Sequence, residues 1–248
     1  MKILVTESQY KKILREEKEQ KIFRVPGLEF FHENKWEAWK ILQEVLEQRG
    51  NPPYTIDSDL DLRGKRINSL GNLKSVGGDL DLQDSSIESL GNLISVGGNL
   101  DLQNTSIKSL GNLTSVGGHL TLENSPIESL GNLQSVGGSL GLENTPIKSL
   151  GNLISVGKTF DLRGTPIESL GNLTSVGGHF NLEGALIKSL GNLKSVGGSL
   201  NLYVTPIESL GNLKSVKRHL DLELTPLSKK YTEDQIRQMV KVGGDIFL

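Results

Sequence analysis

The chain has no cysteine, few aromatic residues and little excess charge of either sign. Without cysteine it can form no disulfide and offers no thiolate nucleophile or thiolate metal ligand. Aromatic residues make up 5% and hydrophobic residues 35% of the 248 residues, which is little apolar material for a conventional globular core. The formal net charge of −2 argues against a protein that binds nucleic acid mainly through its phosphates.

Long apolar runs are also absent. No segment approaches the roughly 20 apolar residues of a membrane span. The first residues, MKILVTESQYKK, turn polar too soon to form the apolar region of a secretory signal. We therefore expect a protein without a membrane partner that is cytoplasmic or otherwise intracellular, with association with a virion as a further option.

What the sequence does contain is an internal repeat. From Leu60 to His219 it repeats every 20 residues, eight times, without insertion or deletion. One unit, residues 80–99, reads LDLQDSSIESLGNLISVGGN. Its aliphatic columns are Leu80, Leu82, Ile87, Leu90, Leu93 and Val96. Six aliphatic residues cannot enclose a core alone, but stacked coils cover one another's apolar edges. The pattern therefore predicts a solenoid with one thin, continuous core.

The pattern within a unit indicates short strands joined by turns. Leu-x-Leu has the two-residue period of a strand with both leucines pointing inward. The return segment, SLGNLxSVGG, contains three glycines and is a poor helix, so it predicts an extended or 3₁₀-like path. Neighbouring coils should then pair as a parallel sheet with strands about 4.8 Å apart.

The repeated residues GGxLxLxx[ST]xI resemble the leucine-rich repeat core LxxLxLxxNxL, with Ser or Thr in place of the usual Asn. SLGNLxSVGG resembles the convex side of short bacterial or bacteriophage repeats of this family. The resemblance implies a curved parallel sheet, a short irregular convex side, helical end caps and a binding role. A parallel β-helix is the alternative architecture. We expect the invariant asparagines, from Asn72 to Asn212, to stack their amides or to bond the convex-side backbone.

Residues 1–54 are predicted to form an N-terminal capping region. Thr6 and Gln9 have the spacing of a capping box for a helix over about 7–18. A second helix is predicted over about 34–49, ending before Gly50. The segment KIFRVPGLEFF between them is ambiguous and could add a strand.

Residues 55–227 are assigned to the solenoid and residues 228–248 to a C-terminal cap. Thr232 can cap a helix within residues 231–240. The last residues, VGGDIFL, match VGGDLDL of residues 76–82, so they predict a final strand with Ile246 and Leu248 inward.

Function is sought where the repeats differ. The outward positions around each predicted strand are polar and change from coil to coil, whereas the frame that carries them is almost fixed. We therefore expect a protein partner to bind this strip on the sheet face. The predicted contact residues are Asp79, Asp81, Asp101, Gln103, Thr121, Glu123, Asp161, Arg163, Asn181, Glu183, Asn201 and Tyr203.

Two groups on this strip invite comparison with metal sites. Asp61, Asp81 and Asp101 should stack along it, but Ca²⁺ generally takes six to eight oxygen ligands and no loop spacing here supplies them. We predict an acidic patch and no metal site, while the sequence leaves Ca²⁺ binding to the patch open. His119, His179 and His219 are separated by about 14 and 10 Å, too far to share one metal ion.

Another column alternates in sign, from Glu88 and Lys108 to Lys188 and Glu208. On stacked coils each charge would face opposite charges above and below. The alternation predicts a structural ladder built from a duplicated unit of two coils.

Catalysis finds little support in the sequence. No His or acid recurs beside the periodic serines, and the Gly-Gly turns lack the lysine and the strand–loop–helix context of a phosphate loop. We predict a non-enzymatic protein without cofactor or nucleic-acid partner, and leave its oligomeric state open. Its expected function is protein binding; the alternatives are a structural spacer or assembly component, and an ice-binding surface that displays the Ser/Thr column.

Overall fold

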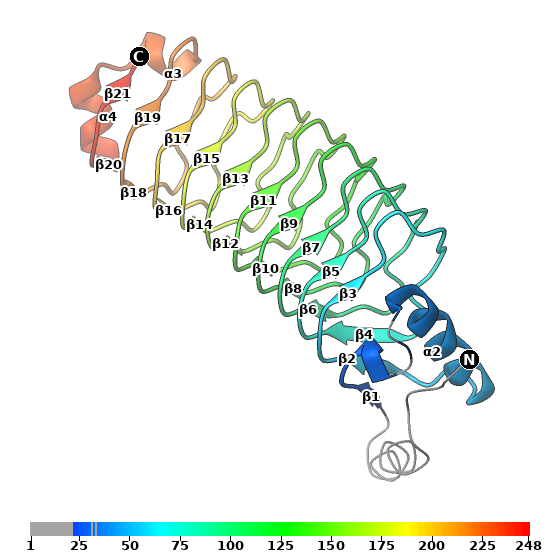
Figure 1. The fold of residues 1–248 in the computed structure, drawn as a ribbon. Coiled ribbons are helices and arrows are strands. Elements are labelled where there is room, and N and C mark those ends of the chain that lie inside the picture. Colours follow the sequence, from blue (N-terminus) through cyan, green and yellow to red (C-terminus); the bar gives the residue numbers. More distant parts are fainter. Residues whose placement is uncertain (1–21, 31, 33) are drawn as a thin grey trace.

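The computed structural model describes residues 22–30, 32 and 34–248, which wind into a parallel β-solenoid, or β-helix (Figure 1). Each coil contributes one short strand to each of two parallel sheets. This confirms the predicted repeat solenoid with parallel strands, and the stated alternative describes the same winding. The helix predicted over about 7–18 lies outside the described residues.

The first sheet is named the Ser-Val sheet after its commonest strand sequence. Its strands, in order, are β1 (Phe23–Val25), β2 (Tyr54–Ile56), β4 (Leu73–Val76), β6 (Ser95–Val96), β8 (Ser115–Val116), β10 (Ser135–Val136), β12 (Ser155–Val156), β14 (Ser175–Val176), β16 (Ser195–Val196), β18 (Ser215–Val216) and β20 (Lys241–Val242). Valine points inward and is buried, while serine is half-buried. The predicted extended return is thus present, and because identical extended segments lie side by side, they pair as a second sheet.

The second sheet is named the Leu sheet. Its strands are β3 (Leu60–Asp61), β5 (Leu80–Asp81), β7 (Leu100–Asp101), β9 (Leu120–Thr121), β11 (Leu140–Gly141), β13 (Phe160–Asp161), β15 (Phe180–Asn181), β17 (Leu200–Asn201), β19 (Leu220–Asp221) and β21 (Ile246–Phe247). Equivalent residues of neighbouring coils pair directly, as Leu80 does with Leu100. The first residue of each strand points into the core, and the second lies on the outer face.

The core is the predicted column of aliphatic residues between the two sheets. Phe160 and Phe180 replace leucine in adjacent coils, and their rings stack with centroids 5.0 Å apart. The Ser/Thr column is buried as well. Six of its hydroxyls bond the backbone of their own coil, whereas Ser85 Oγ is buried without a hydrogen-bond partner. Thr145 Oγ1, for example, donates to the Leu142 carbonyl at 2.7 Å. A buried hydroxyl column cannot face ice, so the ice-binding alternative loses the surface that it requires.

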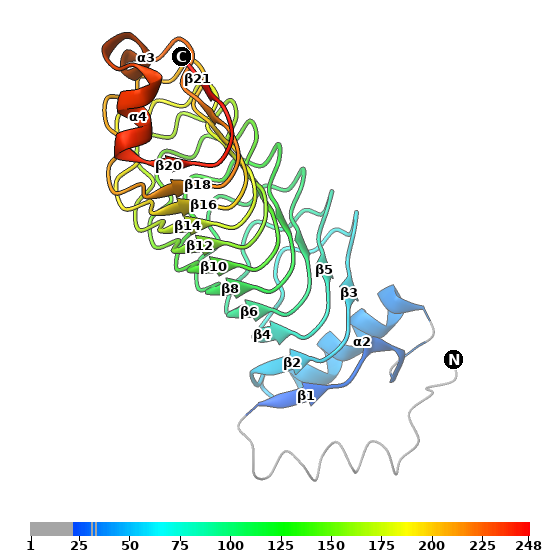
Figure 2. The ribbon, with the colours of Figure 1, turned by 90° about the vertical axis from the view of Figure 1, so that its left-hand side faces the viewer.

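The N-terminal end is covered by a helix, as predicted. α2 (Lys35–Gln48) begins after Asn34, whose side chain accepts hydrogen bonds from two backbone N–H groups of its first turn. Its face with Trp39, Leu42 and Leu46 is buried in the core, and Figures 1 and 2 show it at the start of the solenoid. The ambiguous segment before it forms β1 and a short 3₁₀ helix, η1 (Leu28–Phe30).

The C-terminal end carries two short helices, α3 (Pro226–Lys230) and α4 (Glu233–Met239). Thr232 caps α4 in a complete capping box, as predicted, and Ile236 is fully buried. The final strand, β21, also forms. The inward prediction is right for Ile246 but wrong for Leu248, which is 41% exposed. Leu222, at the equivalent position one coil earlier, is fully buried. Within the described residues, no helix has both the length and the apolar character needed to cross a bilayer.

The coils are joined in pairs at the edge that carries the alternating charges. Glu128 N donates to the Lys108 carbonyl at 2.9 Å, and the same bond recurs from Glu168 and Glu208 to the lysine one coil earlier. We call these closed junctions. At the intervening open junctions, such as that between Glu168 and Lys188, the described residues form no such bond, and a cleft of about 520 Å³ lies there. The charged side chains themselves are exposed, and within the described residues this column forms no ion pair. The expected charge contacts are therefore missing from the described residues. The two-coil unit is instead a pattern of backbone hydrogen bonds, which recurs at every second junction.

The invariant asparagines follow the same alternation. Asn112, Asn152 and Asn192 each donate from Nδ2 to a glycine carbonyl of the preceding coil, at 3.3–3.4 Å. Asn92 donates to the side chain of Asn72 at 2.7 Å. The expected bonding to the backbone therefore occurs, and one pair of asparagines is joined by a hydrogen bond between the side-chain amides.

Candidate functional site

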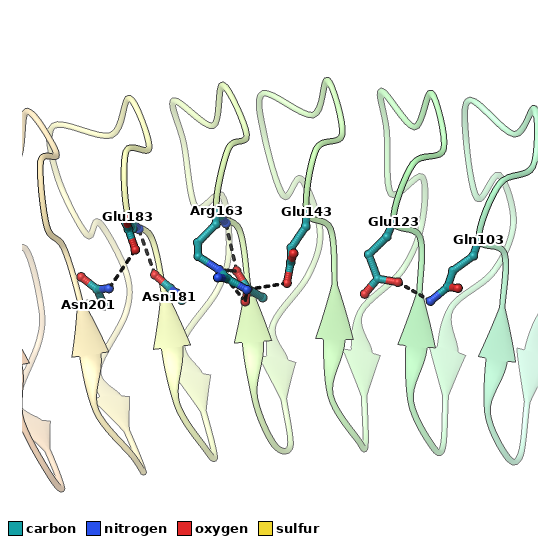
Figure 3. Close-up of polar contacts among 8 residues, drawn as sticks. Gln103, Glu123, Glu143, Arg163, Asn181, Glu183 and Asn201 are labelled. Carbon is teal, nitrogen blue, oxygen red and sulfur yellow. Dashed lines mark hydrogen bonds and ion pairs between the residues drawn. The ribbon is translucent and has the colours of Figure 1, made fainter.

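The outer face of the Leu sheet carries three columns of polar side chains, which we call the variable strip. One column precedes each strand, from Asp59 to Asp245; the second is the outward strand residue; the third lies two residues later, in the turn. All twelve predicted contact residues lie on this strip, and the register places equivalent residues one coil apart. Figure 3 shows its central part from Gln103 to Asn201.

The column of outward strand residues supports the fold as well as the surface. In most coils an Asp or Asn side chain accepts the backbone N–H two residues later, as Asp101 Oδ1 does from Gln103 at 3.0 Å. The residues that make this bond are Asp61, Asp81, Asp101, Asp161, Asn181, Asn201 and Asp221. Such a bond holds the turn after the strand. The sequence predicts that these positions vary from coil to coil for recognition, whereas the turn itself favours Asp and Asn there.

The column before the strand links successive coils. Asp79 Oδ1 accepts the backbone N–H of Asn99 at 2.6 Å, and Asn99 Oδ1 accepts that of His119 at 2.7 Å. His119 Nδ1 continues the chain to Ser139 at 3.1 Å. His179 and His219 accept a backbone N–H in the same way. The histidines are thus backbone acceptors, and no group of three or more potential metal ligands occurs in the described part of the chain.

The second and third columns of the strip contain two cations, Arg63 and Arg163, and both are paired with carboxylates of the strip itself. Arg163 Nη2 lies 2.8 Å from both Asp161 and Glu143. The hydrogen bond and charge of Asp161, followed by those of Glu143, raise the pKa of Arg163. Arg63 pairs with Asp81 in the same manner. The two arginines therefore cross-link neighbouring coils of the strip.

Glu123 is a half-buried carboxylate of the strip. Its side chain lies over Gly141, where an added Cβ would come within 2.2 Å of Glu123 Oε1. Gln103 donates a hydrogen bond to it from the neighbouring coil (Figure 3). Burial raises the pKa of Glu123, and the charges of Glu143 and Asp101 act in the same direction.

Glu123→Gln is expected to stabilise the protein at neutral pH. Because the folded state raises the pKa of Glu123, its contribution to stability is fully present below the pKa of the unfolded chain and is lost as pH rises through the folded value. Glutamine keeps the shape and removes the ionised form, for a gain of up to about 0.5 kcal/mol at this partly exposed site. The melting temperature of the variant should be higher than that of wild type at pH 7 and equal to it at pH 3. An equal difference at both pH values would contradict the argument.

The strip as a whole is acidic. The second and third columns of the strip, from Asp61 to Glu223, contain nine carboxylates and two guanidinium groups. The entire chain has a net charge of only −2. Both arginines are already paired within the strip. A surface with this excess attracts cationic groups and repels anionic ones.

A groove along the Ser-Val sheet is a second candidate surface. It consists of two adjoining hollows of about 650 and 510 Å³, lined by serine, valine and glycine from successive coils. Lys217 and Lys241 line its C-terminal end. Its lining is otherwise nearly identical in every coil, so it offers fewer features for recognition than the variable strip.

One column of the turn was not singled out from the sequence. The residue four positions after each inward strand leucine or phenylalanine has a left-handed backbone, and it is exposed. Its members are Gly64, Asp84, Asn104, Asn124, Asn144, Gly164, Gly184, Val204 and Leu224. The signal available in the sequence was the change from Asp, Asn and Gly to aliphatic residues in the last two coils.

The chain has no significant match among models of known protein families, curated proteins or solved structures. The surface of the solenoid is therefore the basis for assigning a function.

Proposed function

We propose that the chain is a non-catalytic binding module, similar to leucine-rich repeat proteins, whose variable strip recognises a protein partner with a basic surface. The observation that carries this proposal is the combination of a repeated frame with an outer face that changes from coil to coil and has a large excess of carboxylates. A spacer or assembly component would need the frame and its ends, but not this face.

The frame suits recognition because it holds the strip rigid. Backbone bonds within both sheets and side-chain bonds from Asp79 to Ser139 fix neighbouring coils in register. Little conformational entropy would then be lost when a partner binds. The charge excess would accelerate association with a basic partner and discriminate against acidic ones.

The test compares two sets of four Glu→Gln substitutions that change the net charge equally. The strip set is Glu123, Glu143, Glu183 and Glu223, which leaves the turn-holding Asp and Asn residues intact. The control set is Glu88, Glu128, Glu168 and Glu208, in the exposed alternating column. Both variants are used as baits in a native-host lysate, and the captured proteins are quantified.

We expect the strip variant to lose roughly tenfold in capture, and the control variant to capture as wild type does. Capture by wild type should also weaken as salt rises. Equal capture by both variants, or loss of capture only after changes in residues 1–54, would contradict the proposal and favour the spacer.

A further inference from the structure

The variable strip ends in a pair of aliphatic residues with an unfavourable backbone conformation. Val204 and Leu224 both have φ of 57°, in the left-handed region. Side chains with a Cβ are strained there, β-branched ones most of all, whereas Gly and Asn are tolerated. Three coils of the same chain use Asn at this position, namely those with Asn104, Asn124 and Asn144.

Neither side chain belongs to the buried core. Val204 is 48% and Leu224 is 64% exposed. A residue that strains the backbone without packing in the core points to a role outside the fold, since strain of this kind is concentrated at functional sites.

Two further apolar residues lie at the same end of the strip. Phe247 pairs in register with Asp221, and its carbonyl accepts the backbone N–H of Leu222 at 2.9 Å. Figure 1 shows β19 and β21 side by side at the C-terminal end. Phe247 and Leu248 are 44% and 41% exposed. Val204, Leu224, Phe247 and Leu248 are exposed apolar residues of the last coils, and we call this set the C-terminal apolar patch. The ring of Phe247 lies beside that of His219, with centroids 6.1 Å apart. Isolated exposed apolar residues are ordinary, but a group of them on adjoining coils marks a contact surface.

The patch is acidic on the side of the strip: Asp221 and Glu223 belong to its middle coil, and Asp245 begins its last strand segment. On the other side α3, which follows Leu224, ends in Lys229 and Lys230. The ammonium group of Lys230, in α3 beside it, lies 5.1 Å from the ring centroid of Tyr231. A second copy of the chain would bring another acidic strip against this one, and the like charges would repel. The charge pattern instead suits an apolar group flanked by cations.

We infer that the C-terminal apolar patch is the anchor for the partner: it receives a Leu- or Phe-bearing polypeptide segment whose flanking lysines or arginines face the acidic strip. This inference rests on the proposed function and names the end of the strip where recognition is centred. Buried apolar anchors surrounded by polar contacts carry most of the affinity of such interfaces.

The test uses the full chain and two sets of fluorescent 12-residue peptides. One set places Leu or Phe among Lys and Arg, and the other replaces every Lys and Arg by Glu. Val204→Asn with Leu224→Asn removes the apolar side chains and supplies a residue that this turn already uses. The control, Asn124→Val with Asn144→Val, introduces the same strain away from the patch.

Anisotropy titrations should show at least tenfold tighter binding of wild type to the basic set than to the acidic set. The Val204→Asn, Leu224→Asn variant should melt a few degrees higher than wild type and bind the basic set about tenfold more weakly. The control variant should melt lower and bind as wild type does.

Unchanged affinity in the Val204→Asn, Leu224→Asn variant would overturn the anchor. If the four Glu→Gln substitutions of the strip then still weakened binding, the proposed function would survive that result; if they did not, both would fail. Equal binding of the acidic peptides, or no binding of the basic set, would overturn the stated partner chemistry. Self-association of wild type that the Asn variant abolishes would assign the patch to a second copy, contrary to the inference.

Discussion

Replacing Gly177 with alanine is expected to destabilise the protein by about 3 kcal/mol or more. A Cβ at this residue would lie 2.1 Å from the carbonyl oxygen of Gly157 and 2.9 Å from its carbonyl carbon. Both atoms belong to the backbone of the preceding coil, which is held in register by the Ser-Val sheet. The neighbour therefore cannot move aside without separating the coils. The same close approach recurs at the glycine after each valine from Val76 to Val196 and at Gly243, whereas Lys217 takes this position after Val216.

Gly151→Ala is the matched control. Gly151 has φ of 55°, and a Cβ there would meet nothing within 4 Å. The substitution should cost about 1 kcal/mol, from backbone strain alone. Urea unfolding followed by circular dichroism measures both variants. Equal losses would show that the stacked coils can yield at the glycine row, against the argument from close approach.

Deleting residues 228–248 is expected to abolish cooperative unfolding and cause aggregation. The deletion removes α4, β20 and β21 and uncovers the apolar side chains of the preceding coil, including Leu220 and Leu222. It also leaves β18 and β19 as unpaired edge strands, which promote association between chains. Sedimentation and a thermal melt of the truncated chain provide the measurement. A soluble truncated protein with an unchanged melt would contradict the capping role.

A milder form of this prediction concerns one side chain. Ile236 in α4 is fully buried, so Ile236→Ala should cost about 2–5 kcal/mol. Met239, in the same helix, is 48% exposed, and Met239→Ala should change stability by about 0.5 kcal/mol or less. α4 is also tied to the last coil by Arg237, which donates to the carbonyls of Val242 and Gly244. Comparable losses from both substitutions would indicate that α4 does not seal the core.

The periodicity of the sequence was sufficient to predict the solenoid. Equivalent positions such as Leu80 and Leu100 must lie in register when no insertion separates the coils, and the structure pairs them directly. The helices were also readable, because Thr232 and Gly50 mark helix ends by their own local chemistry. The predicted helix over about 34–49 corresponds to α2 at Lys35–Gln48.

Contacts between coils could not be predicted in the same way. A two-residue strand such as Ser115–Val116 carries too little local signal, and it becomes a strand only because the neighbouring coil presents the same segment. The turn bond of Asp101 and the strain at Val204 depend on backbone angles that are absent from the residue pattern. The residues of the candidate strip could thus be chosen from the sequence, whereas the hydrogen bonds by which they hold turns and neighbouring coils could not.

The alternation of closed and open junctions has a mechanical consequence. At a closed junction, such as that between Lys148 and Glu168, backbone bonds at the charged edge add to those of the two sheets. At an open junction that edge carries fewer bonds. Between Glu168 and Lys188 they are Leu186 N–H to the Ile167 carbonyl at 3.0 Å and Asn192 Nδ2 to the Gly171 carbonyl at 3.4 Å. A chain pulled by its ends would therefore part first at the open junctions and release its coils two at a time. Under tension the molecule is a series of 40-residue links, each the length of two repeats.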